Sequence, residues 1–295
     1  MTKLRDWSEK HFGFVLMAPA TIYLAAVALY VTVFLVYYSL CNWSVSSPQP
    51  SFIGLVNYAQ ILKDSKFWES IVLTVVFLIT AVGVEVILGF AIALLLNQQI
   101  YGVKIIRTLL ILPMAMTPVV SGLIWRILYD PTLGLINYLL SFIGIKGPAW
   151  VATAGTALPA VILVDIWQWT PFAFLVITAG LQSLPAEPYE AASIDGAGPF
   201  QVLFRITIPL LKQVLLILIL LRGIDVIKVF DTIYVITNGG PGTATQTLVF
   251  YTFLKGFQWF DLGYASAMAM FLLFAVTILV QFFVKRTGVN LADVN

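Results

Sequence analysis

Charged side chains interrupt the apolar stretch 213–237 of this 295-residue sequence. Arg222, Asp225 and Lys228 stand three residues apart, so successive members are predicted to pair along one helix face. An ionisable group at bilayer depth costs at least ~2.5 kcal/mol, so it is expected to face a cavity or a partner. Two interpretations stay open: a self-paired ladder that packs against another protein, or a polar wall whose Arg and Asp hydrogen-bond the hydroxyl groups of a solute.

A second polar stripe is predicted in the apolar stretch 157–181. Asp165, Gln168, Trp169 and Phe172 recur at helical spacing, so they share one face. A carboxylate, an amide and two aromatic rings suit a polyhydroxylated solute, because its hydroxyls hydrogen-bond and its C–H faces stack on rings. A buried helix–helix contact with a paired aspartate explains the stripe equally well.

Two prolines five residues apart, Pro113 and Pro118, predict a kink or a broken helix within 108–128. Irregular backbone at bilayer depth is tolerated where it lines a cavity. Met114 and Thr117 are therefore candidates for the cavity wall, and a kink that serves packing alone is the alternative.

Two valines extend the predicted wall. Val226 and Val229 lie on nearly the same helix face as Arg222, so we expect them to line the same cavity. Glu85 is predicted to be a paired structural acid outside the site. Arg126 lies near the end of its stretch, where a long side chain reaches the interface without any further function.

The composition points to lipid as the surrounding solvent. The chain is 60% hydrophobic and 10% charged, with a mean hydropathy of +0.97, whereas soluble domains are about a quarter charged. A net charge of +2 is too small and too scattered to indicate a nucleic-acid partner. The single cysteine excludes an intrachain disulfide, and the single histidine excludes a histidine metal cluster.

Six stretches are long and apolar enough to cross a bilayer as helices. They are 13–38, 71–96, 108–128, 157–181, 213–237 and 264–284. The first is kept as a span because it is too long for the core of a signal peptide. The predicted fold is an all-α polytopic membrane protein with one transmembrane domain, 13–284, between terminal segments 1–12 and 285–295.

The distribution of lysine and arginine predicts that both termini are cytoplasmic. The predicted inner segments hold nine such residues: Lys3, Arg5, Lys10, Lys104, Arg107, Arg205, Lys212, Lys285 and Arg286. The predicted outer segments hold four: Lys63, Lys66, Lys146 and Lys255.

The longest predicted cytoplasmic loop, 182–212, contains a short helix. Pro188 suits the first helical position, and Glu190 places negative charge near the positive helix end. Gly196 and Gly198 are predicted to end the helix with a left-handed residue. A helix of about two turns is marginal alone, so it must dock on something to persist. An interfacial loop helix of the kind found in many membrane proteins is the plain alternative.

The same loop resembles the signature loop of ABC importer permeases. The matching residues are Glu190-Ala191-Ala192, Gly196 and the later Ile208-Pro209. The resemblance implies the type I permease fold and a coupling helix that fits a groove on the ATPase subunit. The coupling residues carried over are Tyr189, Glu190, Ala191, Ala192, Asp195 and Gly196.

Three further stretches are similar to the maltose-type and glycerol-phosphate-type sugar permeases: 52–58, 228–231 and 237–242. Asn238 stands where that family usually has glycine. The resemblance implies a sugar (a monosaccharide, oligosaccharide or polyol) as the solute and the bacterial inner membrane as the location. A permease for an anionic sugar derivative or glycerol phosphate is the alternative, and an ion-coupled secondary transporter is a weaker one.

The chain lacks the GxxxxGK[ST] phosphate-binding loop, so it is predicted to bind no cofactor and to be no enzyme. ATP and Mg²⁺ are expected on a partner. The resemblance implies a second homologous permease, two ATPase subunits and an extracytoplasmic solute-binding protein, with alternating access as the mechanism.

Overall fold

The computed structural model describes residues 12–97 and 101–287, and the chain divides into two compact units. The predicted terminal segments 1–12 and 285–295 lie almost entirely outside the described residues. Within the described part, five helices are long and apolar enough to span a membrane. The number rises to six if the bent pair α5–α6 is one span.

The first unit comprises residues up to 64 together with 252–274. Its elements are α2 (Phe12–Ser39), β1 (Cys41–Ser44), β2 (Ser47–Phe52), α3 (Val56–Lys63), the π-helix η2 (Leu254–Gln258) and the first half of α14 (Leu262–Thr287). The antiparallel hairpin β1–β2, which the sequence did not lead us to expect, pairs Cys41 with Phe52. No residue in the apolar window of α2 is buried in the described structure.

Asn57 at the start of α3 joins that helix to the end of α2 and the start of β1. Its side-chain nitrogen donates to the carbonyls of Ser39 and Cys41, both at 2.9 Å, and Tyr58 donates to the Ser39 hydroxyl at 2.8 Å. Gly263 lies against the Cys41 carbonyl so closely that a Cβ there would clash. Asn57 and Tyr58 of the stretch 52–58 therefore provide hydrogen bonds to the residues at the C-terminal end of α2.

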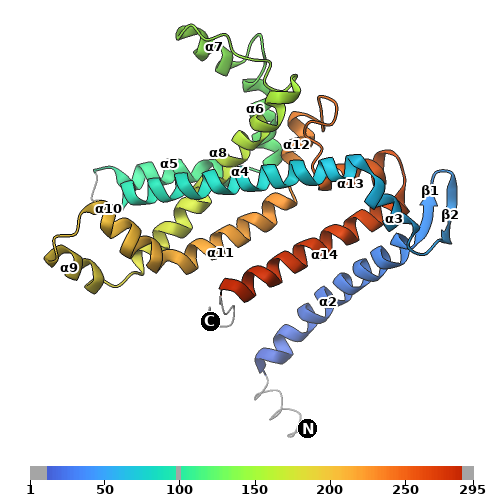
Figure 1. Cartoon of the computed structure of the whole chain (residues 1–295), viewed down its shortest axis with the longest axis horizontal. Helices are drawn as coiled ribbons and strands as arrows, with labels where there is room; N and C mark the ends of the chain where they lie inside the picture. The colour runs from blue at the N-terminus through green and yellow to red at the C-terminus, as the bar shows by residue number, and fades with distance from the viewer. Residues whose placement is uncertain (1–11, 98–100, 288–295) are drawn as a thin grey trace. The chain divides into compact units, whose positions relative to one another are not determined.

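The second unit comprises residues 65–251 and 275–295. Its helices are α4 (Ser65–Leu96), α5 (Val103–Ala115), α6 (Pro118–Leu128), α7 (Leu135–Phe142), α8 (Ala154–Gln182), α9 (Glu187–Ile194), α10 (Pro199–Val202), η1 (Leu203–Thr207), α11 (Ile208–Ile227) and α12 (Asp231–Ile236), with the first four residues of α13 (Leu248–Phe253) and the second half of α14. Figure 1 shows α9 and α10 together at one end of α8 and α11, away from α7.

Helices α4, α8 and α11 form the core of this unit. Seven buried apolar residues pack between them: Ala93, Leu96, Ala173, Phe174, Ile177, Leu211 and Leu218. Gly180 on α8 approaches α11 closely, since a Cβ there would lie 2.9 Å from a Leu211 methyl group. The helices that flank the 182–212 loop are therefore in direct contact near that loop.

The third predicted span is broken, as the two prolines predict. Helices α5 and α6 meet at a bend of 98°. Thr117 begins α6 by accepting a hydrogen bond from the Val120 N–H at 3.4 Å, and Pro118 follows at the first helical position. The backbone thus turns where proline removes a helical hydrogen bond.

The fifth predicted stretch, 213–237, is not one helix. It begins earlier, ends at Ile227 and resumes as α12 at Asp231. Lys228 and Asp231 are exposed at the interruption. The hydropathy pattern did not reveal this break, because the residues on both sides of it are apolar and the average over the stretch stays high.

The segment 129–156 is ordered by polar contacts around α7. Asp130 accepts hydrogen bonds from Leu133 N–H and from the hydroxyl and N–H of Thr132, and these hold the pKa of the Asp130 carboxyl below its usual value. Trp150 donates from its indole nitrogen to Asn137 at 2.7 Å.

Candidate functional site

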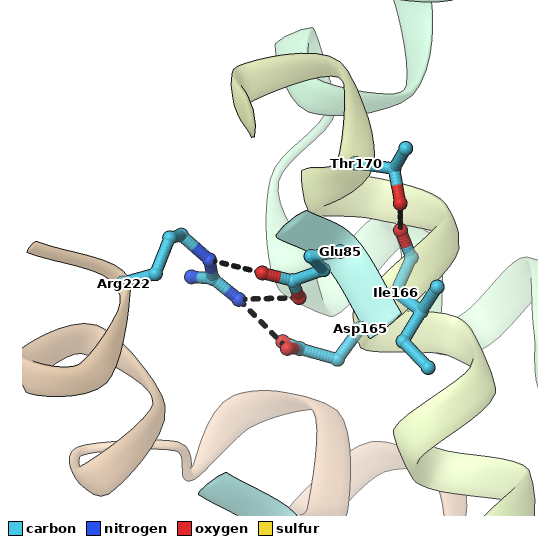
Figure 2. A network of polar contacts seen from close by, with 5 residues as sticks. All are labelled: Glu85, Asp165, Ile166, Thr170 and Arg222. Carbon is cyan, nitrogen blue, oxygen red and sulfur yellow. Dashed lines mark hydrogen bonds and ion pairs between the residues drawn. The ribbon is translucent and has the colours of Figure 1, made fainter. Parts of the chain in front are cut away.

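A buried ionic cluster joins the three core helices of the second unit. Arg222 of α11 donates from Nε to Glu85 Oε2 at 2.7 Å and from Nη2 to Glu85 Oε1 at 2.8 Å. The same Nη2 donates to Asp165 Oδ2 at 2.8 Å. Figure 2 shows the guanidinium facing both carboxyl groups, which come from α4 and α8. One arginine therefore ties α11 to two other helices.

The cluster lies deep inside the protein. Arg222, Glu85 and Asp165 are 2%, 0% and 5% exposed. The Trp169 ring lies 4.8 Å from the guanidinium carbon, so its face adds a cation–π contact. Glu85 is thus paired, as predicted for a structural acid, and its place in a shared cluster with two predicted pathway residues was not foreseen.

The predicted charge ladder on α11 is only partly formed. Arg222 makes its ion pairs with Glu85 and Asp165 rather than with Asp225, so this step of the prediction is wrong. Asp225 and Lys228 do pair at 3.1 Å, and both side chains are more than half exposed. The carboxylates on α4 and α8 are better partners for the buried Arg222 than Asp225 on the next turn of α11. Glu85 in particular binds the guanidinium with both of its oxygens.

The predicted stripe on α8 divides between two environments. Gln168 is buried and donates to the Met116 carbonyl at 2.9 Å, at the point where the chain turns between α5 and α6. Trp169 and Phe172 are half-buried, with their rings edge to face at a centroid distance of 6.5 Å. The polar members of the stripe are therefore occupied by protein groups, and the aromatic members keep open surface.

The remaining predicted wall residues differ in exposure. Val226 is buried and Val229 is half-buried just after the end of α11. Met114 is half-buried near the end of α5, and Thr117 is exposed at the cap of α6.

The predicted loop helix is present as α9. It runs over Glu187–Ile194, with Pro188 in its first turn. Gly196 has a φ of +70°, and two hydrogen bonds close the helix end: Gly196 N–H to the Ser193 carbonyl and Ala197 N–H to the Ala192 carbonyl. This Schellman arrangement requires a left-handed residue, which confirms the predicted role of Gly196 in ending the helix. The same prediction for Gly198 is wrong, because its φ is −71° and it lies beyond the helix end, before α10.

Most of the surface of helix α9 is not covered by other parts of the second unit. Ala192 is buried, Tyr189 is half-buried and donates to the Thr207 hydroxyl at 3.2 Å, and Glu190, Ala191 and Asp195 are exposed. Three large apolar side chains that we did not single out from the sequence are also exposed here: Ile194, Phe200 and Phe204. Ile194 is 87% exposed. They could have been recognised in the sequence as bulky apolar residues within a loop that also holds polar and charged residues.

The backbone conformation of the 237–242 segment accounts for its asparagine and glycine residues. Asn238 has a φ of +50° and Gly239 a φ of +83°, the left-handed region that favours glycine and tolerates asparagine. A Cβ on Gly239 would clash with the Phe250 ring. Asparagine therefore suits this left-handed position, for which the resemblance led us to expect glycine.

Comparison with known proteins places residues 85–287 in the family described as binding-protein-dependent transport system inner membrane component. A trehalose/maltose transport system permease protein, MalF, of Thermococcus litoralis is 41% identical over 73% of this chain and 72% of its own. A sulfoquinovosyl glycerol transport system permease protein, SmoG, of Agrobacterium fabrum is 35% identical over 95% and 91%.

A solved structure shares the fold. It is a bacterial ABC transporter involved in the import of the acidic polysaccharide alginate, with a TM-score of 0.81 over 98% of this chain and 99% of that chain. Its sequence is 21% identical, so the likeness concerns the fold alone.

Proposed function

The chain belongs to the family of binding-protein-dependent transport system inner membrane components, and on this premise we propose that it forms one wall of a sugar pathway driven through α9. As a permease subunit of an ABC importer it works in the inner membrane with a second permease, separate ATPase subunits and a solute-binding protein. ATP hydrolysis belongs to those ATPase subunits, which bind ATP and Mg²⁺.

The observation that carries the proposed coupling is the geometry of α9. The helix is short, ends at a left-handed glycine and is exposed along Glu190, Ala191 and Asp195. An isolated helix of this length is marginal, so we infer that docking on another subunit stabilises it further. The exposed Ile194 gives that subunit an apolar anchor. Movement of the ATPase would then be passed to α8 and α11, which flank the loop.

The proposed pathway wall consists of residues with open surface. Trp169 and Phe172 offer aromatic faces to the C–H face of a sugar, and Asp225 offers a carboxylate to its hydroxyls. Val229, Met114 and Thr117 extend this wall. In this proposal Asp165, Gln168, Arg222 and Val226 support the wall from behind, because protein groups already surround them.

A sugar is the proposed solute because a relative that matches over 73% of the chain is named as a trehalose/maltose permease. Relatives named for sulfoquinovosyl glycerol and for sn-glycerol-3-phosphate support the anionic alternative. The alternative, an anionic derivative such as glycerol phosphate, rested on unbalanced positive charge at Arg222 and Lys228. Both cations have carboxylate partners in the structure, so this argument from charge no longer supports an anion.

The coupling proposal is tested at the end of α9. Gly196→Pro cannot adopt a φ of +70°, because proline is fixed near −65°. We expect it to abolish uptake and to uncouple ATPase activity, with unchanged affinity for the binding protein. Gly198→Ala is the matched control: Gly198 has an ordinary φ of −71° and open space where a Cβ would lie, so uptake stays normal.

Wild-type uptake by the Gly196→Pro complex would rule out α9 as the mechanical link. Substrate class is tested separately by titrating the cognate binding protein calorimetrically with neutral sugars, polyols and glycerol phosphate. Tight binding of glycerol phosphate alone would overturn the neutral-sugar assignment and leave the coupling proposal untouched.

A further inference from the structure

The cluster of Glu85, Asp165 and Arg222 carries unequal formal charge. It holds two carboxyl groups and one guanidinium, and each residue is at most 5% exposed. If both carboxyls were ionised, the interior of a membrane-spanning unit would hold an uncompensated negative charge. Such a charge is costly to bury, and proteins usually neutralise it by binding a proton or a counter-ion.

The surroundings do not supply a second cation. Asp225 also acts electrostatically on the cluster, but it is negative as well and is paired with the exposed Lys228. Among the described residues, the other charged groups on α4, α11 and the helices packed around them are exposed or bonded elsewhere: Lys66, Glu69, Lys104, Arg107, Arg126, Lys212, Asp231 and Lys285. Trp169 faces the guanidinium but carries no charge.

The two carboxyl groups are held differently by Arg222. Glu85 offers both oxygens to the guanidinium, the two-pronged arrangement that suits an ionised carboxylate. Asp165 offers only Oδ2, so its second oxygen is available to carry hydrogen. Both carboxyl groups accept from the same Arg222 Nη2, at 2.8 Å each, so two acid groups gather around one donor. Two ionised carboxylates this close repel each other, and one bound proton removes that repulsion.

We propose that the cluster is a buried proton-binding site in which Asp165 holds one proton on the oxygen that Arg222 does not bind. The proton comes from solvent and forms an O–H bond on Asp165, so the cluster becomes neutral: one carboxylate, one neutral acid and one guanidinium. The neutral network joins α4, α8 and α11, and the last two flank the loop that carries α9 (Figure 1).

The site has a defined pH dependence. The contribution of the bound proton to stability is complete only at acidic pH, where the unfolded chain also holds that proton. It declines as the pH rises above the ordinary range of an aspartate, until the proton has left the folded cluster. Asp165→Asn supplies a neutral hydrogen-bonding group that does not titrate, so it removes the dependence. The exposed Asp231→Asn on α12 is the matched control for the loss of one carboxylate and keeps the wild-type dependence.

Thermal unfolding of the purified complex with its ATPase subunits, measured from pH 6 to about pH 10, is the first test. We expect the melting temperature of the wild type to fall below that of Asp165→Asn as the pH rises, and Asp231→Asn to follow the wild type. Parallel curves for the wild type and Asp165→Asn would overturn the proposal. Failure of Asp165→Asn to assemble would also count against it, because the amide keeps the cluster neutral.

Infrared spectroscopy of the same complexes is the second test and does not depend on any variant being stable under alkali. The wild type should show the C=O stretch of a protonated carboxyl that shifts in D₂O. The band should be absent in Asp165→Asn and in Glu85→Gln, where the remaining acid ionises beside Arg222. A wild-type spectrum without this band, or a shift caused by sodium rather than by protons, would refute the site. Neither measurement involves transport, so its failure is separate from failure of the proposed function.

Discussion

Gly89 sets the distance between α4 and α8. A Cβ on Gly89 would lie 2.7 Å from the Ala173 Cβ and 2.8 Å from the Phe174 backbone nitrogen. Because the second contact is backbone, the helices would have to move apart, and overpacking of this kind costs about 1–3 kcal/mol. We expect Gly89→Ala to lower the melting temperature of the purified complex.

Gly83 on the same helix is the control position, where an added methyl group is expected not to lower the melting temperature. A Cβ on Gly83 would have no neighbouring atom within 4 Å, so Gly83→Ala should be neutral or should stabilise the helix by up to about 1 kcal/mol. Equal melting temperatures for the two variants would show that the α4–α8 distance is not set by Gly89.

Individual residues show where sequence reasoning reaches its limit. The sequence predicted that Glu85 is paired, since an isolated acid at bilayer depth is costly, and the structure confirms the pairing. It did not identify Arg222 as the partner, because the two residues are 137 positions apart. Helical spacing shows which residues share a face, whereas the neighbour across that face is decided by packing between helices.

Gln168 stabilises the turn between α5 and α6 from a third helix. Its side chain donates to the Met116 carbonyl at 2.9 Å, beside a bend of 98°. Gln168→Leu removes the donor and leaves a carbonyl without its partner, which costs about 1–3 kcal/mol. We expect a lower melting temperature and faster proteolysis between Ala115 and Pro118 in the purified complex.

Gln182 at the end of the same helix is the control. It is exposed, so Gln182→Leu should change neither the melting temperature nor the cleavage rate. If Gln168→Leu were as resistant to protease as the wild type, the bend would be maintained by the prolines alone.

At the scale of elements, residues with strong local preferences gave the most reliable predictions. Pro113 and Pro118 predicted the broken third span, and Gly196 predicted the end of α9, because each residue restricts its own backbone. The interruption after Ile227 has no proline or glycine at the break, and the hairpin after α2 has few strand-forming residues. Those two features depend on tertiary contacts that a hydropathy pattern does not contain.

At the scale of the whole molecule, the pattern of apolar stretches predicted a polytopic helical membrane protein, and the family membership confirms it. The pattern also predicted which side of the membrane each loop occupies, from nine positive residues against four. This orientation stays a prediction, because the arrangement of helices is compatible with either direction of insertion. It matters for function, since α9 must face the compartment that holds the ATPase.

Orientation can be measured because the chain has one cysteine, Cys41, which is buried. In a Cys41→Ala background, Lys146→Cys and Ser193→Cys each place one thiol at an exposed position, in the segment around α7 and on α9. If positive charge sets the direction of insertion, a membrane-impermeant maleimide labels the Lys146→Cys protein in spheroplasts. The Ser193→Cys protein should be labelled only after the membrane is permeabilised and the complex is denatured. Labelling of Ser193→Cys alone in intact spheroplasts would invert the topology, put α9 out of reach of any cytoplasmic ATPase and contradict the proposed coupling.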